Sequence, residues 1–218
     1  MNELHFAPGA CSFVPHVALE LVRAATGEDF APRLVKLHKG EHLTPEYLAL
    51  NPDGQVPLLV VDGRPLSQVV AICDWLDRQY PAAGLLPSDP WTRAQAMSVL
   101  AWMNNTVHPT FTHVFMPHKF AEGELTHAEL KRFNAALYRG LLERIQSLVE
   151  RGSPWIFGER VGVVDAYALT LLRWGGMARI DPDSLPAYKA YVERLATTPA
   201  VAAALERERL PLHAFKKD

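Results

Sequence analysis

The sequence has only two cysteines, no long apolar run and no block of basic residues. Because only Cys11 and Cys73 are present, no disulfide framework beyond a single bridge is possible, and a reducing, cytoplasmic location is expected. No apolar run reaches the roughly 20 residues that a membrane-spanning helix needs. The first residues, MNELHF, include an acid and lack the basic start and apolar stretch of a signal peptide. We therefore expect neither a membrane protein nor a secreted one.

The charge balance narrows the choice of partners. The formal net charge is -2, which argues against nucleic acid or an anionic membrane as the main partner. Apolar residues make up 49% of the 218 residues and charged residues 21%, as in a globular protein with a sizeable core. This length suits one large domain or two modest ones. No metal site is predicted.

The first third of the chain alternates between strand and helix patterns. Apolar runs on either side of Asp62-Gly63 predict a tight hairpin, because this dipeptide tolerates the positive φ angles of such a turn. Counting elements gives the order β-α-β-α-β-β-α. The expected strands cover residues 3–7, 30–37, 56–61 and 64–67, and the expected helices cover residues 12–25, 44–50 and 68–80.

The rest of the chain contains no persuasive strand. A Pro- and Gly-rich segment at residues 81–88 is predicted to be a linker. Asp89-Pro90 predicts an N-cap and first-turn proline for a long helix through residue 108. THAE at residues 126–129 resembles a capping box ahead of another helix. We therefore predict an α/β domain at residues 1–80 and an all-helical domain at residues 89–218.

Cys11 lies where the first strand should turn into the first helix. The unpaired amides of a helix N-terminus stabilise a thiolate and lower its pKa, and the Ser12 hydroxyl could donate to the same sulfur. A small buried apolar residue at a tight turn explains Cys11 equally well. Cys73 falls on an apolar helical stripe with Val69, Ile72 and Leu76, which favours a structural role.

Two further segments have both a structural and a ligand-binding interpretation. Pro57 begins a strand; a cis bond after Val56 would leave the Val56 main chain free to pair with an extended peptide-like ligand. An edge-strand proline without a ligand is the alternative. Gln68 and Val69 would begin the third helix, where free amides attract a carboxylate, and Ser67 could serve as the N-cap.

Together these segments resemble the cytosolic glutathione transferase family, in which a thioredoxin-like domain precedes a helical domain. PGACSFVPHVALE at residues 8–20 is similar to the first turn of the bacterial beta class, which carries a cysteine there. NPDGQVPLL at residues 51–59 is similar to the cis-proline segment of the family. GERVGVVDAYAL at residues 158–169 resembles its helical-domain folding motif. The resemblance covers essentially the whole chain.

The resemblance implies a role for each site residue toward glutathione, the co-substrate. Cys11 and Ser12 would face the glutathione sulfur, and His108 would reach the same site. The cis-proline segment, Val56-Pro57, would present the Val56 main chain to the cysteinyl backbone. The full set of candidates is catalytic Cys11, Ser12 and His108, with Val56, Pro57, Gln68, Val69, Asn105 and His38 binding glutathione. Asn105 is expected one turn before His108 on the same helix face.

The chain departs from the family pattern at four places. Val69 replaces a Ser or Thr and removes a hydroxyl donor. Pro109 replaces a lysine frequent in the beta class and is expected to disturb the helix. Gly162 replaces the Ser or Thr N-cap of the folding motif. His38 and Lys39 are equal candidates for the basic residue expected after the second strand.

We expect a glutathione transferase that activates the glutathione thiol for conjugation to a small apolar electrophile, or for thiol–disulfide exchange through Cys11. Phe111, Phe115 and Trp174 are candidate pocket walls, although core packing explains them equally well. Glutathione-dependent isomerisation or dehalogenation is an alternative, and so is a non-catalytic binding or regulatory protein with the same scaffold. The resemblance also implies a homodimer.

Overall fold

Apolar strands near the N-terminus form a four-stranded sheet in the computed structural model, which describes residues 2–152 and 154–216. The strands are β1 (Asn2–Phe6), β2 (Phe30–Leu34), β3 (Leu58–Val61) and β4 (Arg64–Ser67). Their order across the sheet is β2-β1-β3-β4, with β1 parallel to β2 and antiparallel to β3. The predicted hairpin is confirmed, because Asp62 and Gly63 join β3 to β4 with φ angles of 48° and 79°.

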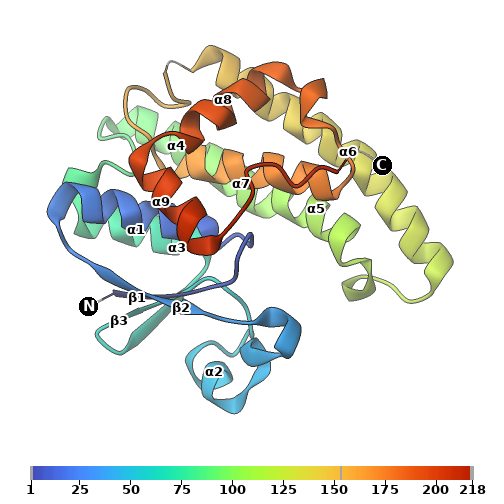
Figure 1. Ribbon diagram of the computed structural model, residues 1–218, viewed down its shortest axis with the longest axis horizontal. Helices are drawn as coiled ribbons and strands as arrows, with labels where there is room; N and C mark the ends of the chain where they lie inside the picture. Colours follow the sequence, from blue (N-terminus) through green and yellow to red (C-terminus); the bar gives the residue numbers. More distant parts are fainter. Residues whose placement is uncertain (1, 153, 217–218) are drawn as a thin grey trace.

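Three helices complete the N-terminal unit: α1 (Phe13–Thr26), α2 (Pro45–Leu50) and α3 (Val69–Gln79). Figure 1 shows α1 and α3 on the sheet face that looks toward the other helices, and α2 on the opposite side. The α3 stripe with Cys73 is buried in the core, as its spacing predicts. The element order is therefore the predicted one.

The remaining chain is helical, as predicted. Its helices are α4 (Pro90–Trp102), α5 (His108–Phe115), α6 (Glu124–Arg151), α7 (Val163–Met177), α8 (Pro186–Ala196) and α9 (Pro199–Glu208). Nearly all of α7 is buried, and α1 packs against both α7 and α9. This packing brings the two parts of the chain together around the turn before α1 (Figure 1).

Of three helix starts predicted from capping patterns, the structure confirms one and contradicts two. Asp89 caps α4, because its carboxylate accepts the Thr92 N–H at 2.8 Å. The expected capping box at residues 126–129 is wrong: α6 already begins at Glu124, so Thr126 lies inside its first turn. The expected cap at Ser67 is also wrong, because Ser67 pairs with Leu58 as the last residue of β4.

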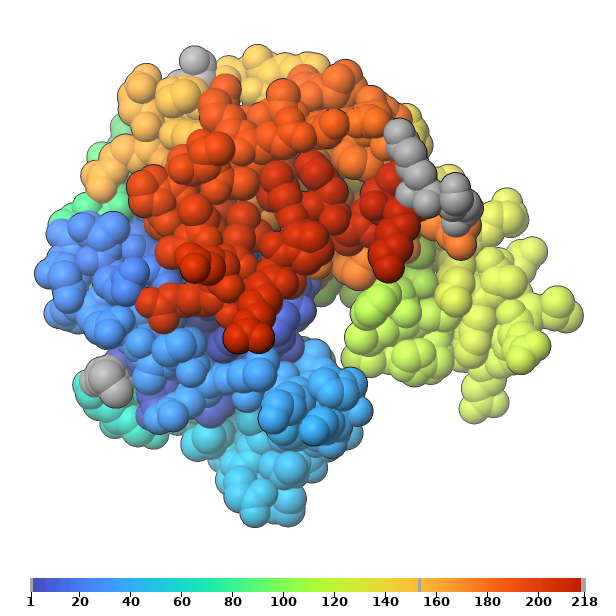
Figure 2. All heavy atoms as spheres, in the orientation of Figure 1, coloured from blue at the N-terminus to red at the C-terminus, as the bar shows by residue number. Residues whose placement is uncertain are grey.

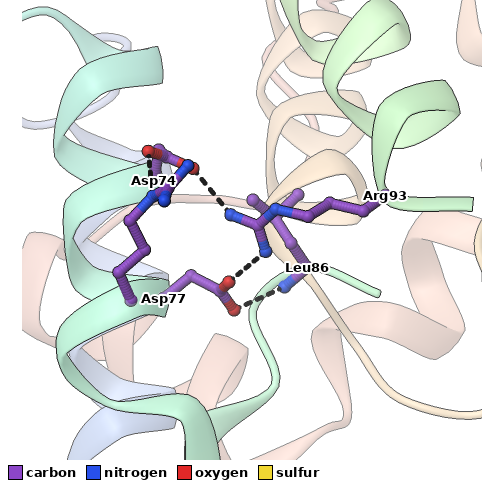
Figure 3. Close-up of polar contacts among 5 residues, drawn as sticks. Asp74, Asp77, Leu86 and Arg93 are labelled. Atoms are coloured by element: carbon purple, nitrogen blue, oxygen red, sulfur yellow. Dashed lines mark hydrogen bonds and ion pairs between the residues drawn. The ribbon is translucent and has the colours of Figure 1, made fainter. Parts of the chain in front are cut away.

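Charged side chains hold α3 and α4 together across the segment that joins them. Arg93 of α4 pairs with Asp77 and, at 2.6 Å, with Asp74, both on α3 (Figure 3). The other Asp77 oxygen accepts the Leu86 N–H at 3.0 Å. The division at residues 81–88 stays a prediction, although these contacts show how that segment is fixed. Among the described residues, no helix has the length and apolar character to cross a bilayer.

Candidate active site

The turn between β1 and α1 is held by Ser12. Its buried hydroxyl accepts the Ala7 N–H at 3.1 Å and donates to the Ala7 carbonyl at 3.2 Å. These two bonds close the turn on itself. The expected hydrogen bond from the Ser12 hydroxyl to the Cys11 sulfur is therefore wrong, because that hydroxyl proton is directed to Ala7. Ser12 shapes the turn that carries Cys11.

Cys11 is partly buried, and its Sγ donates to the Val56 carbonyl oxygen at 3.6 Å. Burial raises the pKa of the Cys11 thiol to about 12 and outweighs the hydrogen bonds from the Cys11 and Ser12 backbone, which lower it. The expected lowering of the pKa by the helix N-terminus is therefore wrong. Cys11 is a protonated thiol at neutral pH, and thus a hydrogen-bond donor.

The segment opposite Cys11 is the predicted cis-proline turn. The Val56-Pro57 bond is cis, and the ladder of β3 begins only at Leu58. The Tyr47 hydroxyl and the Asn51 amide both donate to the Gln55 carbonyl, each at 2.7 Å. This pair of bonds fixes the backbone just before Val56. The turn that follows β1 and the segment that precedes β3 thus meet at the contact between Cys11 and Val56.

Gln68 lies at the start of α3 with a φ of 74°, a left-handed value that is uncommon for a residue with a side chain. Such backbone strain is frequent at binding sites. The Val69 side chain is 3% exposed and packs in the core, so only its N–H is available to a ligand. His38 and Lys39 are both exposed in a 3-10 turn, Leu37–Lys39, and the choice between them stays open.

His108 opens α5 and belongs to a hydrogen-bonded chain. The Tyr167 hydroxyl donates to the Asn104 Oδ1 at 3.3 Å, so it accepts from His108 Nδ1, 2.9 Å away. This bond places the imidazole proton on Nδ1 and leaves the Nε2 lone pair available. Burial lowers the pKa of His108 to about 4, so the ring is neutral at neutral pH. Tyr167 was missed from the sequence because it lies in a uniformly buried helix.

A π-helical segment, Met103–Val107, changes which asparagine faces His108. The His108 N–H bonds to the Met103 carbonyl, five residues back, so the turn holds an additional residue. Asn104 shares Tyr167 with His108, whereas Asn105 is exposed and accepts the Thr106 hydroxyl at 2.8 Å. The expected common face for Asn105 and His108 is therefore wrong. The π-helical segment ends two residues before Pro109, which lies within α5.

Trp174 connects His108 to the turn that carries Cys11. Its Nε1 donates to the Gly9 carbonyl at 2.8 Å, and its ring centroid lies 4.6 Å from that of His108. Phe111 stacks on Trp174 at 4.7 Å and on Phe115 at 5.5 Å. Phe115 is 53% exposed, so this row of rings runs from the core to solvent. It supplies an apolar wall near the thiol, as well as core packing.

Two cavities are lined by residues other than the thiol and the aromatic row. A cavity of about 560 Å³ runs along the segment between α3 and α4, and one of about 540 Å³ lies between these helices. Cys11, Val56 and His108 are absent from the described residues that line these two. Figure 2 shows an open hollow between the blue N-terminal unit and the green α5 region. No cluster of three or more described His, Cys, Asp or Glu residues could hold a metal ion.

Known proteins with this arrangement identify its family. Residues 17–79 match the glutathione S-transferase N-terminal domain, and residues 102–199 match the glutathione S-transferase C-terminal domain. A glutathione S-transferase of Escherichia coli O157:H7 is 32% identical over 95% of this chain and 99% of its own length. The chain belongs to the glutathione S-transferase family. Its thioredoxin-like sheet unit and helical unit are those predicted.

Two further relatives of this glutathione S-transferase bear on its chemistry. The solved structure of a sphingomonad glutathione S-transferase complexed with glutathione has a TM-score of 0.81 and 31% identity, covering 96% of this chain and 100% of that one. A protein of Pseudomonas aeruginosa named maleylacetoacetate isomerase is 31% identical over 84% of this chain and 86% of its own length.

Proposed function

We propose that the protein conjugates glutathione to a small apolar electrophile at the site formed by Cys11 and the Val56 main chain. Membership of the family makes it a transferase that uses glutathione as co-substrate. The observation that carries the proposal is the contact between the Cys11 Sγ and the Val56 carbonyl. This contact places the Cys11 thiol, a hydrogen-bond donor, next to the Val56 main chain, which lies just before the paired residues of β3. The cysteine at this turn also favours the beta class, and the two reduced thiols suit the cytoplasm.

Glutathione would bind in an extended form across three elements. Its cysteinyl backbone pairs with the Val56 main chain in the manner of an added strand. Its γ-glutamyl carboxylate meets the N-terminus of α3, where the first amides have no partner within the helix. Gln68 holds this end with its strained backbone. Its glycyl carboxylate lies toward His38 and Lys39.

Conjugation then needs a group that accepts the glutathione S–H proton and a hydrogen-bond donor to the glutathione sulfur. The Nε2 of neutral His108 takes the glutathione S–H proton, and its Nδ1–H stays with Tyr167. The glutathione sulfur forms a bond to the electrophilic carbon as the leaving group departs with its electron pair. When glutathione is bound, the single Cys11 S–H proton turns from the Val56 carbonyl to the glutathione thiolate and stabilises its charge. The aromatic row at Phe111 and Phe115 holds the apolar acceptor.

A pair of Cys11 variants tests this role. Serine keeps a donor at the position, so Cys11→Ser should retain kcat/KM within about threefold, whereas Cys11→Ala should lose about tenfold, the worth of one hydrogen bond to a charged group. Turnover on a panel of electrophiles and the ultraviolet thiolate absorbance of bound glutathione measure the effect. Equal activity in the two variants would remove Cys11 from the chemistry. Glutathione binding without turnover on any electrophile would favour a non-catalytic binding protein.

Thiol–disulfide exchange through Cys11 is disfavoured, because a thiol with a pKa of about 12 is scarcely ionised at neutral pH. Isomerisation is the second candidate, because one relative is named maleylacetoacetate isomerase. In that reaction glutathione is regenerated. Maleylacetoacetate converted without consumption of glutathione would therefore establish this activity, while stoichiometric consumption of glutathione with chlorinated aromatics would establish conjugation.

We further propose a homodimer in which α3 and α4 of two copies meet. An open groove between these helices is lined by the apolar side chains of Val70, Ala71, Pro90, Ala94 and Met97 together with Gln68 and the charged Asp74, Arg78 and Arg93. A two-fold axis would bury this groove against itself. Met97→Glu should therefore convert dimer to monomer in light scattering. Leu125→Glu, at a residue that is 86% exposed on α6, is the control and should stay dimeric. A monomeric wild type would contradict the proposal.

A further inference from the structure

Glu208, the last residue of α9, reaches the turn that carries Cys11. The residue is 3% exposed, and its Oε2 accepts the Gly9 N–H at 2.9 Å. The two residues are 199 positions apart in the chain. A charged acceptor makes a backbone hydrogen bond of this kind strong. The C-terminal helix therefore holds the main chain two residues before the thiol.

The second oxygen of Glu208 is fixed as well. His16 Nδ1 lies 2.8 Å from the Oε1, and His16 is fully buried on α1. The imidazole is itself confined between Phe6 and Phe30, with ring centroids 5.1 and 5.6 Å away. Because both oxygens are engaged and the histidine cannot move, the carboxylate presents one fixed acceptor to Gly9.

Gly9 is held on its other side too. Its carbonyl accepts from Trp174 Nε1 at 2.8 Å, so both of its polar groups bind side chains of the helical unit. Its φ is 73°, and a Cβ there would lie 2.6 Å from the Arg173 Nη1. The turn is thus fitted to α7 and α9. Cys11 lies two residues after Gly9 in the same turn.

We propose that Glu208 is a positioning residue that sets the place of the Cys11 thiol through the Gly9 amide. The inference rests on the proposed function, in which Cys11 donates to the glutathione sulfur. Loss of the carboxylate releases the Gly9 N–H, and the turn then samples positions in which the thiol leaves Val56. The thiol becomes more accessible and less able to stabilise glutathione thiolate.

The neighbouring residue Arg207 supplies a matched control. Its guanidinium pairs with Glu20 of α1 at 2.7 Å, and Glu20 is 2% exposed. Glu20 and His16 lie one turn apart on α1, so Arg207 and Glu208 dock α9 on the same helix. The Arg207 pair docks α9 on α1 without a bond to Gly9. Arg207→Ala therefore weakens the docking of α9 on α1 but leaves the hydrogen bond between Glu208 and Gly9 in place.

The experiment compares Glu208→Ala, Glu208→Gln and Arg207→Ala in the full chain. Hydrogen exchange at the Gly9 amide and alkylation of Cys11 by iodoacetamide, read as intact mass, need no glutathione. Glu208→Ala should raise both rates about tenfold or more, the effect of one lost charged hydrogen bond. Glu208→Gln retains an acceptor oxygen and should stay within about threefold of wild type, and Arg207→Ala should leave the Gly9 exchange unchanged.

Kinetics complete the comparison. Glu208→Ala should lower kcat about tenfold while KM for the electrophile changes little, and Glu208→Gln should restore it. Equal Gly9 exchange and Cys11 alkylation in Glu208→Ala and Arg207→Ala would overturn the proposal. If Glu208→Ala does not fold, Glu208→Met replaces it, because methionine keeps the side-chain volume without the carboxylate. Rapid exchange of the Gly9 amide in the wild type would by itself refute the hydrogen bond between Gly9 and Glu208. If the wild-type protein binds no glutathione, the proposed function is refuted. The comparison of Gly9 exchange and Cys11 alkylation among the variants stays valid, because it needs no glutathione.

Discussion

Replacing Asp165 with alanine should cost about 4 kcal/mol of folding free energy, because two buried donors and one partly buried donor lose the carboxylate that they share. Asp165 is 3% exposed near the start of α7. Its Oδ2 accepts the Gly162 N–H at 2.7 Å, and its Oδ1 accepts the Ile156 N–H at 3.1 Å and the Tyr191 hydroxyl. It thus caps α7, anchors the preceding loop and holds α8. Gly162 has no side chain to share this capping.

Urea unfolding measures the Asp165 effect, with Asp89→Ala as the matched control. The Asp89 carboxylate also caps a helix, but it is exposed and serves only α4, so its loss should cost about 1 kcal/mol. Asp165→Asn should lie between, because an amide has one acceptor oxygen for three donors. A loss at Asp165 no larger than that at Asp89 would show that this loop and α8 are held in another way.

Replacing His108 with alanine should lower kcat/KM for conjugation by about 10² to 10³, the usual worth of a positioned base. Its Nε2 is the acceptor, because Tyr167 fixes the proton on Nδ1. His113 supplies the control, since it lies on the same helix with its Nδ1 2.7 Å from the Pro109 carbonyl. His113→Ala should leave kcat within about threefold, because it loses the contact with the Pro109 carbonyl and the stacking on Phe120 but no proton acceptor of the proposed site.

The pH profile separates a base from a packing role for His108. Because burial lowers the pKa of His108 to about 4, the base form is complete above about pH 5. As pH falls toward 4, protonation of Nε2 should reduce the rate of proton transfer. A decline in wild-type kcat centred near the ordinary histidine value of about 6.5 would contradict this assignment. So would His108→Ala with unchanged kcat.

Features set by short-range sequence were predictable. The Asp62-Gly63 turn, the Asp89 cap and the order of elements along the chain follow from local backbone preferences. The roles of Cys11 and Val56 came from a family resemblance, because nothing in either segment alone shows that they meet. The capping pattern at residues 126–129 misled because Gly123, with a φ of 87°, already allows α6 to start earlier.

Features set by contacts across the chain could not be predicted. The pKa of Cys11 depends on its burial beside Val56, and that burial outweighs the helix field. Because of the π segment before His108, Asn104 and not Asn105 shares Tyr167 with His108. No local sequence pattern marks the additional residue in this turn. Glu208 closes a contact with Gly9 across nearly the whole chain. Such pairs are visible only once α1, α7 and α9 have packed together.

A crystal structure of the protein with reduced glutathione tests the central claim most directly. The account predicts the glutathione sulfur beside the Cys11 Sγ, the cysteinyl backbone paired with the Val56 main chain, and the γ-glutamyl carboxylate at the start of α3. Glutathione bound instead in the cavity along the segment between α3 and α4, with Cys11 still donating only to Val56, would contradict it.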